Sequence, residues 1–253
     1  MAINVVWFKR DLRLSDHAAL ELASRLPQKC LLLYILEPAL LSNSHYRGRH
    51  WQFIAQSLRD LQQVLNASGR EVAVLEGNAV ALLNELDERL GIVNLLSYEE
   101  TGLDVTFQRD LAVAKLCDAK GIVWRQFQTN GIERGRHNRT GWNKSWHRVM
   151  TSPCHTVPVT RLNTVSLSSE PVFTALRSAK YETWLTARSD LQQGGQTQAQ
   201  QVLSSFLTER GWGYQKFISK PENSRVHCSR LSPYLAWGNL SIRQAYQALQ
   251  QQE

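Results

Sequence analysis

Short apolar runs alternate with longer helical patterns along the first 130 residues of this chain. The five runs are INVVWF, CLLLYIL, EVAVLE, IVNLLS and IVWRQF, and they begin at residues 3, 30, 71, 92 and 122. Most of them are almost continuously apolar, which is typical of parallel strands covered on both faces. Five such strands with four crossover helices predict an α/β fold with a doubly wound five-stranded parallel sheet.

The segments between the runs carry the signals of amphipathic helices. Side chains such as Ser15, Asp16 and Asn78 can accept hydrogen bonds from the first free N–H groups of a helix. In the longest segment, residues 47–68, apolar side chains recur on one face and Gly69 ends the pattern. We expect helices from Ser15 or Asp16 to about Arg25, over residues 47–68, from Asn78 to Leu90, and from Asp104 to Gly121.

The carboxyl ends of parallel strands are where such sheets bind ligands. Polar turns follow three of the runs: KRDLRLSDH from residue 9, EP at residues 37–38, and YEETG from residue 98. No run is followed by a G-x-G-x-x-G fingerprint, which argues against an NAD-dependent dehydrogenase. In the first turn, the charged side chains permit two interpretations, a local salt-bridge cluster or a site for an anionic or flavin-like ligand. These side chains are Lys9, Arg10, Asp11 and Arg13.

Composition narrows the class of protein. Hydrophobic residues make up 43% and charged residues 20% of the 253 residues, as in ordinary soluble globular proteins. The first apolar run is too short for a signal peptide, and no run reaches the length of a membrane span. The four cysteines, Cys30, Cys117, Cys154 and Cys228, are scattered and form no C-x-x-C pair. This spacing predicts neither a structural metal site nor a disulfide framework, and it fits a reducing cytoplasm.

Basic charge is concentrated in the second half of the chain. The formal net charge is −1 over residues 1–130 and +8 over residues 131–253. Such an excess indicates either a solvated basic surface or an anionic partner, such as nucleic acid or a phosphorylated cofactor.

One stretch of this half, ERGRHNRTGWNKSWHR at residues 133–148, interleaves basic and aromatic residues. Basic side chains suit a phosphate backbone, and aromatic rings suit exposed bases. Trp142 and Trp146 are four residues apart, a spacing that also places two rings on one helix face against a core. Both interpretations stay open. The candidate DNA contacts in this stretch are Arg134, Arg136, Arg139 and Lys144.

Beyond this stretch, an irregular connection rich in Ser, Thr and Pro occupies residues 151–171. We expect it to cross the surface of the first domain. A helix is then expected over residues 197–214, with Val202, Leu203 and Phe206 directed inward.

Two consecutive helix starts are expected near the end of the chain. Ser232 can cap a short helix with Pro233 at its first position, and Ser241 can cap a second helix. Neighbouring helix N-termini, assisted by Arg230 and Arg243, can bind an anion. The alternative is plain capping without a ligand.

Three stretches near both ends of the chain carry a family resemblance. They are VVWFKRDLRLSDHAAL at residues 5–20, GGQTQAQQVLSSFLTERGWGY at 194–214 and CSRLSPYLAWGNLSIRQ at 228–244. The first resembles the opening of the DNA photolyases and cryptochromes, and the other two resemble the start of their flavin-binding domain. The resemblance implies an antenna-type α/β domain over 1–130, a connector over 131–195, and an incomplete beginning of the helical FAD-binding domain over 196–253.

The resemblance also implies cofactor sites. The phosphate and ribitol part of FAD would be lined by Tyr214, Cys228, Ser229, Arg230, Leu231 and Ser232. Cys228 replaces the usual threonine of the family, and a thiol is a weaker hydrogen-bond donor than a hydroxyl. An antenna chromophore, whether folate, flavin or deazaflavin, would bind near Phe8, Lys9, Arg10 and Asp11. A member without an antenna is equally compatible with these residues.

The activity that the resemblance implies is light-driven repair of DNA by a monomeric flavoprotein. FAD would donate an electron to a flipped-out pyrimidine dimer in DNA, and the electron would return after the dimer splits. Ile218 stands where many photolyases carry an arginine that meets DNA, and Lys216 and Lys220 nearby are candidate contacts. The catalytic residues of the family lie further along than Glu253. We therefore expect this chain to be part of a longer protein or a truncated product, inactive alone.

Two other functions remain as alternatives. One is a cryptochrome-type blue-light sensor without repair activity, for which Ile218 is a mild indication. The other is a nucleotide-binding α/β module that does not use light.

Overall fold

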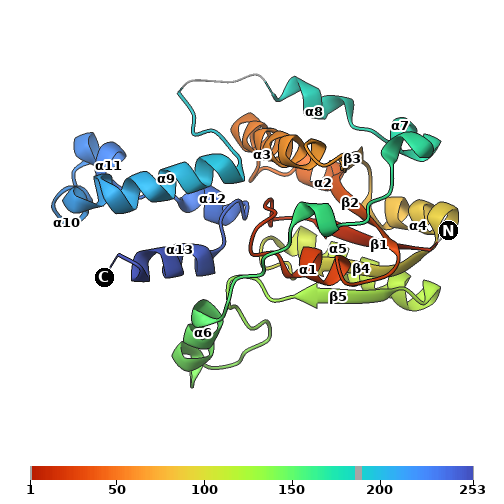
Figure 1. The fold of residues 1–253 in the computed structure, drawn as a ribbon, viewed down its shortest axis with the longest axis horizontal. Coiled ribbons are helices and arrows are strands. Elements are labelled where there is room, and N and C mark those ends of the chain that lie inside the picture. Colours follow the sequence, from red (N-terminus) through yellow and green to blue (C-terminus); the bar gives the residue numbers. More distant parts are fainter. Residues whose placement is uncertain (1, 186–189, 253) are drawn as a thin grey trace.

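The computed structural model describes residues 2–185 and 190–252, and the first half of the chain forms a five-stranded sheet (Figure 1). The order of the strands is β3-β2-β1-β4-β5, and each neighbouring pair is parallel. The predicted doubly wound α/β fold is confirmed, and every strand begins and ends within one residue of its predicted run. The strands are β1 (Ile3–Phe8), β2 (Lys29–Leu36), β3 (Val72–Glu76), β4 (Ile92–Tyr98) and β5 (Val123–Phe127).

Helices cover both faces of the sheet. Val6 and Phe8 of β1 belong to the core on one face, and Val5 and Trp7 belong to the core on the other. Because both faces are covered, the strands read as continuous apolar runs and not as alternating ones. The first core contains residues of α1 (Ala18–Ala23) and α3 (Gly48–Asn66), and the second contains residues of α4 (Ala79–Leu90) and α5 (Asp104–Lys120). The short α2 (Pro38–Leu41) follows β2.

The observed N-cap residue matches the predicted one in α4 and differs from it in α1. The Asn78 side chain accepts hydrogen bonds from the N–H groups of Val80 and Ala81, at 3.0 and 3.1 Å, so the predicted cap of α4 is confirmed. The expectation that Ser15 or Asp16 caps α1 is wrong. His17 is the N-cap, and its Nδ1 accepts from the N–H of Leu20.

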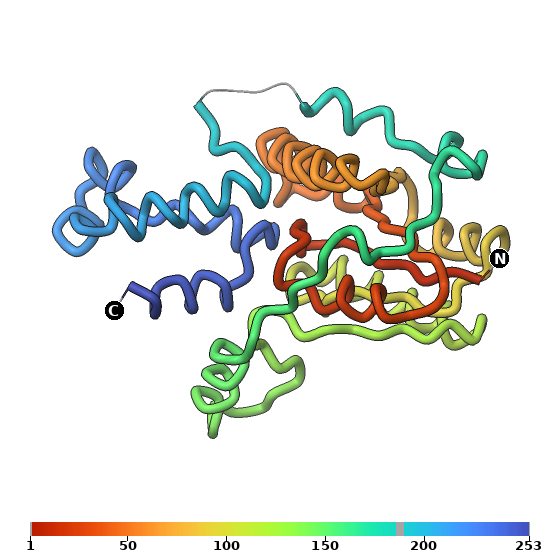
Figure 2. The backbone as a smooth tube through the Cα atoms, viewed as in Figure 1, coloured from red at the N-terminus to blue at the C-terminus, as the bar shows by residue number. Residues whose placement is uncertain are grey.

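The connection after the sheet runs along the α/β part of the molecule, as predicted (Figure 2). Its chain hydrogen-bonds to Cys30 at the start of β2, since the Cys30 N–H donates to Asn163 and its carbonyl accepts from Val165. Further along, Arg177 forms an antiparallel bridge with Leu75 of β3. The elements of this region are α6 (Trp142–Thr151), the 3-10 turns η1 (Val159–Arg161) and η2 (Leu167–Ser169), α7 (Pro171–Ala175) and α8 (Ala179–Thr183).

The last sixty residues form short helices that extend beyond the carboxyl edge of the sheet (Figure 1). Ser241 caps α13 through its hydroxyl, as predicted, with Gln244 completing a capping box. Ser232 is not a cap, because the buried Leu231 holds that position and Ser232 is the first helical residue. The elements are α9 (Gln196–Thr208), η3 (Arg210–Gly213), α10 (Tyr214–Phe217), α11 (Pro221–His227), α12 (Ser232–Ala236) and α13 (Ile242–Gln250). Among the described residues, no helix is long and apolar enough to cross a membrane.

Candidate functional site

The turn between α11 and α12, residues 228–232, is held from one side by Arg210. The Arg210 guanidinium donates to the carbonyls of Val226 and Cys228 through Nη1, and to Ser229 through Nη2 at 3.2 Å. Its Nε donates to the hydroxyl of Ser205 on α9 at 3.1 Å. Burial and the neighbouring Arg230 charge lower the pKa of Arg210. One side chain therefore binds two carbonyls of the turn, those of Cys228 and Ser229, and the Val226 carbonyl in the helix before it.

A second clamp acts on Arg230, the residue in the middle of the turn. Arg230 adopts a left-handed conformation with φ of 59°, which only a minority of non-glycine residues adopt. Gln192 secures it in both directions: the Gln192 amide donates to the Arg230 carbonyl at 2.7 Å, and its oxygen accepts from the guanidinium at 3.1 Å. Sequence reasoning missed both Arg210 and Gln192, because their targets are backbone carbonyls that carry no sequence signal.

The clamped turn presents donors on its other side. The backbone N–H groups of Ser229, Arg230 and Ser232 have no acceptor within the described part of the chain. The hydroxyl of Ser232 is exposed at the start of α12. Unpaired N–H groups beside hydroxyls and a guanidinium suit phosphate oxygens. The residues present therefore fit phosphate groups, such as those of a dinucleotide.

Tyr214 is the first residue of α10 and follows η3, the segment that contains Arg210. His227 Nδ1 donates to the Arg210 carbonyl at 3.3 Å, which joins η3 to the end of α11. The Tyr214 ring packs edge-on against Phe206 of α9, and its residue is partly exposed. The fold thus brings the predicted Tyr214 segment and the predicted turn into one unit.

Asp16 fastens the loop after β1 to this helical unit. Its carboxylate accepts from the Ser241 hydroxyl at 2.5 Å, from Arg243 Nε at 3.1 Å and from the His155 N–H at 3.0 Å. Burial alone would raise the pKa of Asp16, but Arg243, Ser241 and His155 hold it below its ordinary value. Arg243, expected to help bind an anion, is instead paired with this carboxylate.

Buried charges occupy the carboxyl edge of the sheet. Lys9 Nζ pairs with Asp110 at 3.0 Å, and Arg109 pairs with Asp110 at 2.8 Å, with Glu100 at 3.4 Å and with Glu37. All five side chains are less than 10% exposed. Burial lowers the pKa of Lys9 and raises that of Glu37, although their ionic partners oppose both shifts. Within the charged turn, Lys9 and Arg10 bind residues distant in sequence, whereas Asp11 pairs with His17 of the same turn.

Each predicted antenna residue has a partner at this edge. Phe8 lies in the core, and Asp11 accepts from the Lys9 N–H at 2.6 Å and from His17 Nε2 at 2.8 Å. Because His17 Nδ1 accepts from Leu20, Nε2 carries the proton in this pair. Arg10 donates to the Ala236 carbonyl at 2.9 Å.

Space for an antenna chromophore is limited here. The guanidinium of Arg109 lies 4.7 Å from the ring centre of Trp7, and the cavity beside them has only about 20 Å³. A planar chromophore on Trp7 would have to displace Arg109. A second cavity, of about 210 Å³, is lined by Arg10, Tyr98 and Glu99, among others. Binding of an antenna by residues 8–11 remains a prediction, and the cavity of about 210 Å³ has more space for one than the cavity beside Trp7.

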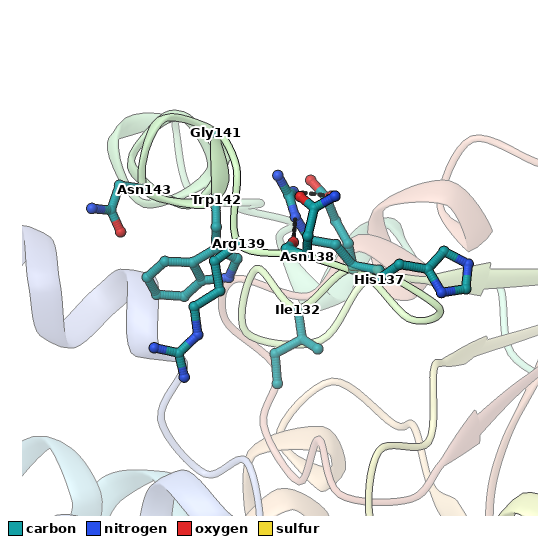
Figure 3. A pocket seen from close by; sticks show the side chains of 9 residues that line it. Ile132, His137, Asn138, Arg139, Gly141, Trp142 and Asn143 are labelled. Atoms are coloured by element: carbon teal, nitrogen blue, oxygen red, sulfur yellow. Dashed lines mark hydrogen bonds and ion pairs between the residues drawn. The ribbon is translucent and has the colours of Figure 1, made fainter.

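The basic stretch forms a loop and the helix α6, which packs on α13. Trp142 stacks on Trp146 with ring centres 6.0 Å apart, and Trp146 meets Tyr246 edge-on at 5.5 Å. The packing interpretation therefore holds for Trp146, while Trp142 at the end of the stack stays 38% exposed. An open cavity of about 740 Å³ lies against Trp142 (Figure 3).

The six candidate DNA contacts differ in what they already bind. Arg134 pairs with Glu99, and Arg136 pairs with Glu133 and donates to two loop carbonyls. The side chains of Arg139 and Lys144 have no hydrogen-bonding or ionic partner in the described part of the chain. Lys216 and Lys220 are exposed and lie over the Phe217 ring at 5.3 and 5.6 Å.

Comparison with known proteins places these features in a family. Residues 4–141 match the DNA photolyase family model. Cryptochrome-2 of Gallus gallus is 26% identical over 97% of this chain and 46% of its own length. The deoxyribodipyrimidine photo-lyase of Vibrio cholerae is 28% identical over 96% of this chain and 54% of its own length. The chain thus spans about half the length of these relatives.

Solved structures agree in fold. An archaeal photolyase from Sulfolobus tokodaii, described with two FAD molecules, superposes with a TM-score of 0.77 at 21% identity, over 99% of this chain and 55% of that one. A Synechocystis cryptochrome gives 0.77 at 19% identity, over 100% and 56%. Since the family match covers more than half of the chain and takes in the whole sheet, the chain belongs to the DNA photolyase family.

Proposed function

We propose that this chain is the part of a light-dependent FAD flavoprotein that holds the cofactor's phosphates, in a protein that repairs pyrimidine dimers in DNA by photoinduced electron transfer. The observation that carries the proposal is the turn at 228–232. Its carbonyls are held back by Arg210, and its N–H groups and hydroxyls are left for an anionic ligand. Membership of the DNA photolyase family supports FAD as that ligand.

Within this proposal, the residues of the turn bind the phosphates of FAD. Ser229, Arg230 and Ser232 bind the phosphates, with Tyr214, Cys228 and Leu231 completing the wall. The chemistry that FAD supplies when bound is light-driven transfer of one electron. The clamps on the turn keep its donors oriented before the ligand arrives, so little ordering is required on binding.

The domain limits and the partner belong to the same proposal. Residues 1–130 form the α/β domain, 131–195 the connector and 196–253 the beginning of the FAD-binding domain. DNA is the macromolecular partner, and Arg139, Lys144, Lys216 and Lys220 are the cations available to its phosphates. Four free cysteines support a location in the reducing cytoplasm.

The test uses the full-length protein that contains this chain. Purified protein should contain FAD in about equimolar amount, and blue light should restore a thymine-dimer oligonucleotide that stays damaged in the dark. A folded full-length protein without flavin would overturn the proposal.

A cryptochrome-type sensor is the second candidate. Ile218 favours it, because this exposed apolar side chain stands where many photolyases carry an arginine toward DNA. Flavin that is photoreduced while the dimer stays intact would select this candidate over repair.

A further inference from the structure

The loop before α6 is fixed in shape by its own hydrogen bonds. Gly131, Gly135 and Gly141 all have φ near +70°, a conformation that glycine adopts at little cost. Arg136 donates to the carbonyls of Asn138 and Thr140 inside the loop. The loop is therefore shaped before any ligand arrives.

Glu133 ties the same loop to α6. Its carboxylate accepts from Arg136 and from the Ser145 hydroxyl on the first turn of the helix. Glu133 is the single acidic residue of the 133–148 stretch. Its carboxylate and the Arg136 guanidinium therefore both form bonds within this stretch. The charges that remain unpaired in this part of the described chain, including Arg139 and Lys144, are positive.

The cavity between this loop and α6 is lined by the exposed ring of Trp142 and by hydrogen-bond donors that have no acceptor in the described structure. Trp142 has Trp146 stacked against it and also lines the cavity of about 740 Å³, together with Ile132 and Arg139 (Figure 3). The start of α6 lies there too, since Gly141 and Asn143 are lining residues. Gly141 provides no side-chain cap, and the N–H groups of Asn143 and Lys144 have no acceptor in the described structure.

We propose that this cavity binds one unpaired nucleotide of a nucleic-acid strand, independently of any lesion. The base stacks on Trp142, and the adjoining phosphate is bound by Arg139 and the N-terminus of α6. The proposal rests on the proposed function only in taking DNA as the partner. It does not involve flavin.

Geometry and charge favour a single strand over a duplex. Bases in a duplex are stacked on both faces and present only their edges, so they cannot cover the face of Trp142. A cavity of several hundred cubic ångströms is of the size that holds a small molecule. The net charge of +8 over residues 131–253 draws in the polyanionic strand.

The test measures binding in the dark of a short fluorescent oligothymidine strand to the full-length protein, by anisotropy. Trp142→Ala should weaken binding by about 5- to 100-fold, the range seen when one stacking residue is removed, and Trp142→Phe should recover most of it. An abasic strand of the same length should bind equally to wild type and to Trp142→Ala. Arg139→Gln should weaken both strands and lower the salt dependence by about one unit of slope.

Matched controls are Phe107→Ala, an exposed aromatic residue on α5, and Arg161→Gln, an exposed arginine on η1. Neither should change strand binding, and thermal melting checks that every variant is folded. The proposal is overturned if Trp142→Ala binds oligothymidine like the wild type, or if thymidine monophosphate competes as well as the strand. Repair of the dimer under light depends on the flavin site and not on this cavity. A full-length protein that binds the strand but does not repair the dimer would therefore count against the proposed function and not against the proposed cavity.

Discussion

Arg210 and Gln192 show how single side chains prepare a binding turn. Both act on backbone carbonyls, and together they occupy those of Val226, Cys228, Ser229 and Arg230. The run CSRLS could be singled out from the sequence because its hydroxyls and arginine are visible there. The arginine that orients it could not, since the carbonyls it binds approach only when α9, η3 and α11 pack together.

The first prediction concerns this arginine. Arg210→Gln should lower the unfolding free energy of the full-length protein by about 2 kcal/mol, because four carbonyls, those of Val202, Val226, Cys228 and Ser229, lose a charged donor. FAD affinity should fall by about tenfold. Urea unfolding and flavin titration measure the two effects. Arg225→Gln is the matched control, since Arg225 donates to one exposed carbonyl, that of Asp190. Unchanged FAD affinity in Arg210→Gln would count against an orienting role.

The second prediction concerns Cys228, which stands where the family usually has threonine. Cys228→Thr should strengthen FAD binding by about 2- to 10-fold, the value of one neutral hydrogen bond, because a hydroxyl donates better than a thiol. Cys154→Thr, at a half-buried cysteine away from the turn, should leave the affinity unchanged. Equal or weaker FAD binding by Cys228→Thr would place this side chain outside the cofactor site. Equilibrium flavin titration provides the measurement.

At the scale of elements, strands and long helices follow from the sequence, while junctions between them do not. The apolar runs predicted all five strands, and in β1 to β4 burial leaves little choice of side chain. The start of α1 was mispredicted because Asp16, a good local cap, has φ of 50° and binds Arg243 instead. Arg243 lies more than two hundred residues further along the chain, so no local sequence pattern could predict its contact with Asp16.

The third prediction tests this junction by pH. The folded pKa of Asp16 lies below the ordinary value of about 3.9, so its contribution to stability is present above about pH 4. That contribution is lost as pH falls from about 5 through the folded pKa. Asp16→Asn should cost about 3 kcal/mol at pH 7, because Arg243 loses its buried partner. The variant should also show a shallower loss of stability in acid.

Denaturant unfolding from pH 3 to 7 measures both effects. Asp60→Asn serves as a control, since Asp60 accepts one hydrogen bond from the Thr197 N–H on the exposed side of α9. Parallel stability curves for wild type and Asp16→Asn between pH 3 and 5 would contradict the assignment.

At the scale of the whole molecule, packing is uneven between the sheet and the helices beyond it. Each strand from β1 to β4 has buried side chains, whereas α10, α11 and α13 have none and α9 has only Ala199. Large side chains stay exposed on the helical part, among them Trp212 at 87% and Val226 at 57%. We therefore expect α10 and α11 to be less stable than the sheet, whereas α12 contributes Tyr234 to the core.

The fourth prediction follows from this difference and uses hydrogen exchange. In the 253-residue chain, amides of α10 and α11 should exchange through openings of about 0–2 kcal/mol, and those of β1 through openings of about 5 kcal/mol or more. Adding FAD to the full-length protein should slow exchange in α11 and α12 and leave β1 unchanged. Equal protection of α11 and β1 in the shorter chain would show that the helical part is as stable as the sheet.

The connector has a consequence for solubility. Its residues 176–178 hydrogen-bond to β3, an edge strand, through the Glu76 N–H, the Val74 carbonyl and the bridge to Leu75. An uncovered edge of this apolar strand would be a template for strands of other copies. At the opposite edge, no described strand pairs with the outer side of β5, which is short and carries the exposed Arg125. We therefore expect the connector to protect this edge from aggregation, and proteolytic cleavage near residue 177 should promote edge-to-edge assembly.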